Sequence, residues 1–158
     1  QVKGRNPYRI IVAGKQPIPR SLRLLSQMKD HKTIIVKPAS LNRQAKLPVS
    51  DKSGTTIWHV RAGRDGTVNP RDLLQRAQAF GFRSLLVEGG SKLATSFLKS
   101  QLVDKVILFT APILVGDGVS ALGSIGVGKM ADAVSFRHYS VTSLGRDWVF
   151  VGYPSWTV

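Results

Sequence analysis

A short stretch of the chain combines a carboxylate, a pair of glycines and small polar residues. The apolar run Leu85-Leu86-Val87 leads to Glu88, the only glutamate of the sequence, and Gly89, Gly90 and Ser91 follow. The spacing predicts a buried strand, a tight turn and a helix. The free N–H groups and the dipole of a helix start attract anions, and glycine lets a ligand approach the backbone closely. An ordinary strand-to-helix connection explains the same glycine pair, so the motif alone leaves both interpretations open.

Other reactive side chains form no recognisable constellation. The three histidines, His31, His59 and His138, have no metal-ligand spacing, and the chain contains no cysteine. No Ser-His-Asp grouping can be defended. Asp117 stands between two glycines and fits either a ribose contact or a turn. We therefore predict no metal site and no catalytic triad.

The charge balance limits the class of partner. The chain has 158 residues, a hydrophobic content of 42% and a net charge of +14. Its basic residues are scattered and form no long run, and no zinc-finger or RNA-binding signature is present. A general positive field favours phosphorylated small molecules over nucleic acid. The absence of cysteine and of an apolar stretch of about 20 residues leads us to expect a cytoplasmic protein without a membrane span.

Periodicity places these residues on a series of elements. Asn69 before Pro70 predicts a capped helix that ends near Gly81. Apolar runs and alternation predict the strands, and apolar residues at helical spacing predict the helices. We expect strands over 9–13, 33–36, 55–60, 84–88, 105–111, 134–143 and 147–153, and helices over 21–28, 70–80 and 91–100.

Strands that alternate with helices indicate the α/β class, with a mainly parallel sheet flanked by helices and an antiparallel edge at the C-terminus. Ligands bind at the carboxyl ends of parallel strands. Gly14, the Glu88-Gly89-Gly90 turn and the Ala111-Pro112 segment with its Gly116–Gly118 turn all follow expected strands. We expect one site there, in one domain that covers residues 1–158.

Several motifs, in order, resemble one known family. They are Asn6-Pro7-Tyr8-Arg9, Val87-Glu88-Gly89-Gly90-Ser91, Leu102-Val103-Asp104, Ala111-Pro112-Ile113-Leu114-Val115-Gly116 and Leu144-Gly145-Arg146-Asp147. The sequence is similar to the reductase domain of the bacterial bifunctional riboflavin-biosynthesis deaminase/reductase, which has a dihydrofolate-reductase-like fold. The resemblance covers nearly the whole chain.

The resemblance implies an enzyme that uses NADPH to reduce the ribose of a phosphoribosylamino-pyrimidine to a ribityl chain. Glu88 then contacts the substrate, Gly14 lies against the cofactor, and Lys37 is our own candidate for the 2′-phosphate. Positioning of the nicotinamide against the substrate carbon carries most of such catalysis, so no catalytic residue is assigned. Gly89 is expected to contact the cofactor, and the residues expected to line its phosphates are Gly90, Ser91, Lys92, Leu93, Ala94, Thr95 and Ser96. The backbone amides and the hydroxyls of Ser91, Thr95 and Ser96 are the expected donors.

The sequence departs from the family at two places. The family has Asp where this chain has Ala13 and a hydroxylated residue where it has Gly14. Its first part, with a central strand and an arginine for the substrate phosphate, has no counterpart, so the domain resembles an N-terminally truncated member. A homodimer and an upstream deaminase domain are the partners that the resemblance implies. Another dihydrofolate-reductase-like NADPH reductase, or a noncatalytic basic domain that binds nucleotides or nucleic acid, are the alternatives.

Overall fold

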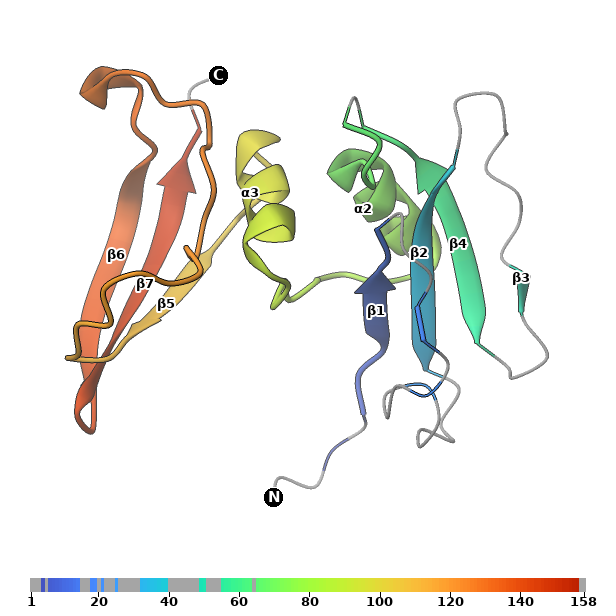
Figure 1. The fold of residues 1–158 in the computed structure, drawn as a ribbon, viewed down its shortest axis with the longest axis horizontal. Coiled ribbons are helices and arrows are strands. Elements are labelled where there is room, and N and C mark those ends of the chain that lie inside the picture. The colour runs from blue at the N-terminus through green and yellow to red at the C-terminus, as the bar shows by residue number, and fades with distance from the viewer. Residues whose placement is uncertain are drawn as a thin grey trace. The chain divides into compact units, whose positions relative to one another are not determined.

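The computed structural model describes residues 4, 6–14, 18–19, 21, 25, 32–39, 49–50, 55–63 and 65–156. The chain forms two compact units, an N-terminal unit over Gln1–Arg83 and a C-terminal unit over Ser84–Val158 (Figure 1). Most of the helix predicted over 21–28 lies outside the described residues. The prediction of one domain over 1–158 stays a prediction.

The N-terminal unit contains a four-stranded sheet in the order β1-β2-β4-β3. Strands β1 (Arg9–Val12), β2 (Thr33–Ala39) and β4 (Thr56–Arg61) run parallel, and β3 (Val49–Ser50) pairs with β4 antiparallel. Strands β1, β2 and β4 were predicted, but β2 is longer than the predicted 33–36 and includes Pro38. Strand β1 pairs with β2 only as far as Val36. Beyond that point, β2 pairs with only one of the described strands, β4, so a residue without an N–H fits there.

Helix α2 (Pro70–Ala79) begins at the predicted cap. The Asn69 side chain accepts hydrogen bonds from the N–H groups of Arg71 and Asp72, at 3.0 and 3.4 Å. The Asp72 carboxylate in turn accepts from the N–H and the Nε of Arg61, at 2.7 and 2.9 Å, which ties the first turn of α2 to the end of β4. The side chains at the core of this unit are Ala13, Ile34, Ile35, Val36, Ala39, Trp58, Val60, Val68, Leu73 and Ala77.

The C-terminal unit combines helix α3 (Ser91–Lys99) with an antiparallel sheet in the order β5-β7-β6. Strands β6 (Ser135–Leu144) and β7 (Asp147–Ser155) form the predicted hairpin, and β5 (Val106–Thr110) pairs with the other side of β7. A short 3₁₀ helix, η1 (Met130–Asp132), precedes β6. The α/β class and the antiparallel C-terminal strands are thus confirmed, while the parallel part of the fold is confined to β1, β2 and β4.

The strand predicted over 84–88 is wrong for the described structure. Residues 82–90 form no helix or strand, and the side chain of Leu86 is 78% exposed. A β-strand is stable only when a neighbouring strand satisfies its backbone groups, and this segment pairs with none of the described strands. The apolar run over 84–88 has the pattern of a buried strand, but that pattern does not show whether a neighbouring strand is available to pair with it.

Helices α2 and α3 end in the same backbone motif, but the residue with positive φ just past the helix differs between them. The N–H of Gly81 bonds to the carbonyl of Gln78 at the end of α2, and the N–H of Gln101 bonds to that of Leu98 at the end of α3. Each motif needs a residue with positive φ just past the helix. Gly81 has φ 99°, and Gln101, with φ 55°, is the one non-glycine residue of the described chain with positive φ.

We therefore expect Gln101→Gly to raise the free energy of unfolding by about 1 kcal/mol, because glycine adopts this conformation without steric cost. Gly81→Gln is the matched exchange and should lower it by a similar amount. Urea unfolding followed by circular dichroism measures both. A change of the same sign in the free energy of unfolding of both variants would contradict this explanation.

Candidate functional site

The two helices differ at their N-termini. The first turn of α2 is closed by the Asn69 side chain, whereas α3 begins at Gly90, which has φ −61°, ψ 173° and no side chain to cap the helix. The Gly90 carbonyl accepts from the N–H groups of Leu93 and Ala94. Among the residues that the structure describes, no acceptor is found for the N–H groups of Ser91 and Lys92. These donors and the helix dipole are features that favour an anion at the start of α3.

The two glycines before α3 have different surroundings. A Cβ atom on Gly89 would lie 2.7 Å from Cδ2 and 3.3 Å from Cβ of Leu93, so a side chain fits here only if the Leu93 side chain moves. A Cβ atom on Gly90 would meet no atom within 4 Å. Gly89 therefore serves the packing of the turn against the helix, and the backbone at Gly90 is open to a ligand.

The hydroxyl groups of α3 are not equally available. Thr95 is 8% exposed, and its hydroxyl donates to the Ser91 carbonyl at 2.6 Å and accepts from the N–H of Gly123 at 2.7 Å. The Ser96 hydroxyl donates to the Leu93 carbonyl at 2.7 Å. The Ser91 hydroxyl makes no hydrogen bond within the described part of the chain. Of the three predicted phosphate donors, Ser91 is thus the one whose hydroxyl is uncommitted.

The remaining predicted site residues lie in both units. Glu88 and Lys92 are exposed beside the start of α3 in the C-terminal unit. Gly14 follows β1 in the N-terminal unit, and Lys37 lies within β2, opposite His59 of β4 and not at the strand end. Both are exposed. That these two groups of residues form one site stays a prediction.

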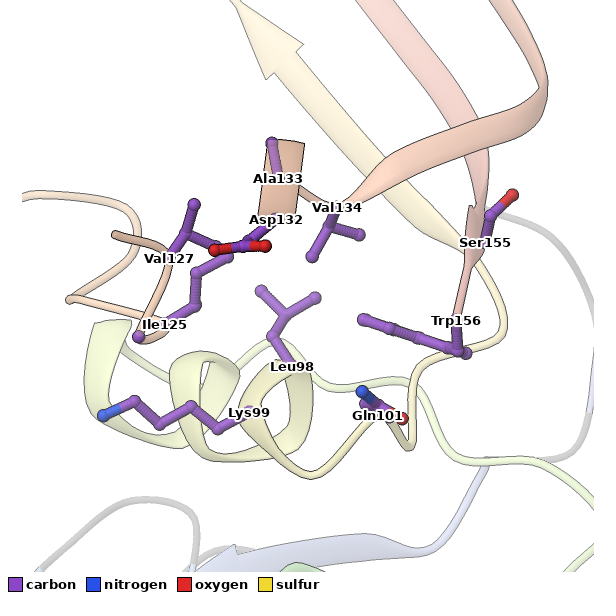
Figure 2. A pocket seen from close by; sticks show the side chains of 11 residues that line it. Leu98, Lys99, Gln101, Ile125, Val127, Asp132, Ala133, Val134, Ser155 and Trp156 are labelled. Carbon is purple, nitrogen blue, oxygen red and sulfur yellow. The ribbon is translucent and has the colours of Figure 1, made fainter. Parts of the chain in front are cut away.

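A pocket that the sequence did not indicate lies at the other end of α3. It has a volume of about 170 Å³, and Leu98, Val134 and Trp156 form much of its apolar wall (Figure 2). The Trp156 indole donates to the Val103 carbonyl at 3.0 Å. Asp132 and Gln101 contribute polar groups to the same wall. Because the pocket is at the C-terminal end of α3, it is separate from the open N–H groups.

The described residues support neither a metal site nor a membrane-spanning helix. They contain no group of three or more His, Cys, Asp or Glu side chains that could hold a metal ion. None of the helices within them has the length and apolar character needed to cross a membrane.

The α/β fold and an open helix N-terminus are typical of proteins that bind phosphorylated cofactors. The family model described as "RibD C-terminal domain" matches residues 1–150, and the chain belongs to this family. It is 27% identical over 145 residues to the riboflavin biosynthesis protein RibD of Aquifex aeolicus, a match that covers 92% of the chain and 38% of that protein. It is 29% identical over 146 residues to the 2,5-diamino-6-ribosylamino-4(3H)-pyrimidinone 5′-phosphate reductase of Methanothermobacter thermautotrophicus, covering 91% of the chain and 64% of that protein.

Solved structures agree on the fold. The chain is similar to Acinetobacter baumannii RibD with a TM-score of 0.69 and 19% identity, over 94% of the chain and 38% of that structure. It is also similar to the riboflavin biosynthesis reductase of Saccharomyces cerevisiae, with a TM-score of 0.68 and 17% identity, over 94% of the chain and 70% of that structure. The predicted dihydrofolate-reductase-like fold is confirmed by these neighbours.

Proposed function

We propose that the chain is an NADPH-dependent reductase domain of riboflavin biosynthesis. The observation that carries the proposal is the uncapped start of α3, where no described residue accepts from the N–H groups of Ser91 and Lys92 and the space beside Gly90 is open. The diphosphate of a dinucleotide is the anion that this terminus fits. The net charge of +14 favours NADPH over NADH, because the 2′-phosphate adds negative charge to the ligand.

The proposed substrate is a phosphoribosylamino-pyrimidine, either 5-amino-6-(5-phosphoribosylamino)uracil or the related diaminopyrimidine, reduced to the ribityl product. The name of the Methanothermobacter relative supports this class of substrate. Glu88 is exposed one residue before the glycine pair, so its carboxylate is available to sugar hydroxyls. In this role Glu88 orients the substrate, and hydride transfer between the cofactor and the ribose carbon depends on the positions of the two ligands.

The proposal extends to partners and location. The chain spans about two fifths of the RibD proteins and about two thirds of the archaeal reductase that it matches. An upstream deaminase domain in the parent protein and a cytoplasmic location fit these relatives.

We also expect a homodimer, because one face of the β5-β7-β6 sheet exposes apolar side chains. They are Leu108, Tyr139, Val141 and Trp148, which the strand register places on the same face. Elution as a monomer at micromolar concentration would contradict the homodimer.

Calorimetric titration with NADPH and NADH, at two salt concentrations, tests the cofactor. We expect NADPH to bind more tightly than NADH, with a preference that shrinks as salt rises, because salt screens the interaction of the 2′-phosphate with exposed cations. Lys37→Met separates this contribution, since it should weaken NADPH binding and leave NADH unaffected. Absence of NADPH binding to the chain would overturn the proposed cofactor. Equal affinity for the two dinucleotides would overturn only the preference.

A further inference from the structure

The longest stretch without regular structure in the C-terminal unit runs from Ala111 to Lys129, between β5 and η1. Connections without secondary structure rarely exceed about 12–15 residues, and those that do are usually functional or disordered segments. This stretch contains five glycines, Gly116, Gly118, Gly123, Gly126 and Gly128. Every residue except Ile125 is exposed. We name this stretch the glycine-rich segment.

A single hydrogen bond joins the glycine-rich segment to the rest of the described structure. The N–H of Gly123 donates to the Thr95 hydroxyl at 2.7 Å, and the other hydrogen bonds of the segment stay within it or with the adjacent η1. Further along, a pocket separates the segment from α3, since Ile125 and Val127 line it together with Leu98 (Figure 2). The segment is therefore held to α3 near Gly123 and is loosely packed beyond it.

The same hydroxyl holds the first turn of α3. Thr95 donates its hydroxyl proton to the Ser91 carbonyl at 2.6 Å, while its oxygen accepts from Gly123. Ser91 carries one of the two N–H groups at the start of the helix that have no acceptor among the described residues. One nearly buried side chain thus connects the start of α3 with the glycine-rich segment. A hydroxyl group that donates its proton to one partner accepts a hydrogen bond from another more strongly.

We propose that Thr95 is a positioning residue that holds the glycine-rich segment beside the start of α3, where the segment forms a wall of the cofactor site. This role rests on the proposed binding of NADPH at that helix start. It differs from a direct phosphate contact, because the Thr95 hydroxyl is already committed on both sides. NADPH bound at Ser91 and Lys92 then restricts the segment through the Thr95–Gly123 bond.

Hydrogen–deuterium exchange of the 158-residue chain, with and without NADPH, tests the role. Thr95→Val removes the hydroxyl, and Gly123→Pro removes the N–H while it leaves the Thr95–Ser91 bond intact. For both variants we expect exchange over 119–126 to rise about fivefold without ligand, and NADPH affinity to fall about three- to tenfold, as expected for one lost hydrogen bond. NADPH should slow exchange over 119–126 in the unmodified chain and not in these variants.

Two further variants serve as controls. Thr95→Ser keeps the hydroxyl and should behave as the unmodified chain. Ser96→Ala removes a hydroxyl that bonds only within α3, and should leave exchange over 119–126 unchanged. Unaltered exchange in the β6–β7 hairpin shows that a variant is folded. If Gly123→Pro frees the segment but binds NADPH as tightly as the unmodified chain, the positioning role is overturned. If the unmodified chain binds no NADPH, the proposed function fails and the role fails with it.

Discussion

Gly90→Asp is expected to reduce NADPH affinity by about a hundredfold or more while the chain remains fully folded. Gly90 is the N-cap of α3, has backbone angles that Asp adopts readily, and leaves open space where a side chain would lie. Asp is among the best N-cap residues and would bond the free N–H groups itself. Its carboxylate would then occupy the anion site, and two unit charges about 4 Å apart repel by about 4 kcal/mol at an effective dielectric of 20.

Gly90→Ser is the matched control because it adds a cap without a charge. It should stabilise α3 as Gly90→Asp does, by a few tenths of a kcal/mol, and weaken NADPH binding far less. Calorimetry measures the affinities, and thermal unfolding measures the stability. If Gly90→Asp bound NADPH as tightly as the unmodified chain, the phosphates would not lie at the start of α3. A large loss of stability in both variants would contradict the open space beside Gly90.

Elements with local signals were predictable from the sequence. The start of α2 follows from the Asn69-Pro70 pair, and its end follows from Gly81, because capping depends on residues next to each other in the chain. The hairpin of β6 and β7 follows from alternation around the Gly145-Arg146 turn. The turn at the glycine pair and the start of α3 were found in the same way, although the strand predicted before them is absent from the described structure.

Features that depend on distant partners were not predictable. The apolar run over 84–88 looks like a strand in isolation, but pairing is decided by which strand edges are available. The contact between Thr95 and Gly123 joins residues far apart in the sequence, and nothing in either neighbourhood indicates it. The extension of β2 through Pro38 depends on where β1 ends. In each case the deciding information lies in tertiary structure, which overrides local preference.

Trp58 illustrates how much of the N-terminal unit depends on one buried side chain. It is fully buried on β4, and its ring lies against Phe80 and Phe82, with centroid distances of 5.3 and 6.2 Å. The guanidinium carbon of Arg76, on α2, lies 6.0 Å from the ring centroid. The ring therefore fills the space where the strand, the helix and the chain after the helix meet.

The indole of Trp58 has two opposite effects on the stability of the N-terminal unit. Its Nε1 is buried without a hydrogen-bond partner in the described structure. A buried donor without a partner costs about 1–3 kcal/mol, whereas the apolar ring contributes through the contacts that it makes. The two effects predict different outcomes for substitutions that remove the whole ring system and for those that remove only the N–H.

Trp58→Ala should lower the free energy of unfolding by about 3–5 kcal/mol, because it leaves a large cavity in the core. This is a substantial part of the about 5–15 kcal/mol that stabilises a typical domain. Trp58→Phe should cost less than about 2 kcal/mol, since it keeps an aromatic ring and removes the unpaired donor. Urea unfolding, followed by the fluorescence of Trp148 and Trp156 and by circular dichroism, measures both. Equal losses in the two variants would show that the N–H has a partner. A loss below 1 kcal/mol in Trp58→Ala would show that the core of the N-terminal unit does not depend on this ring.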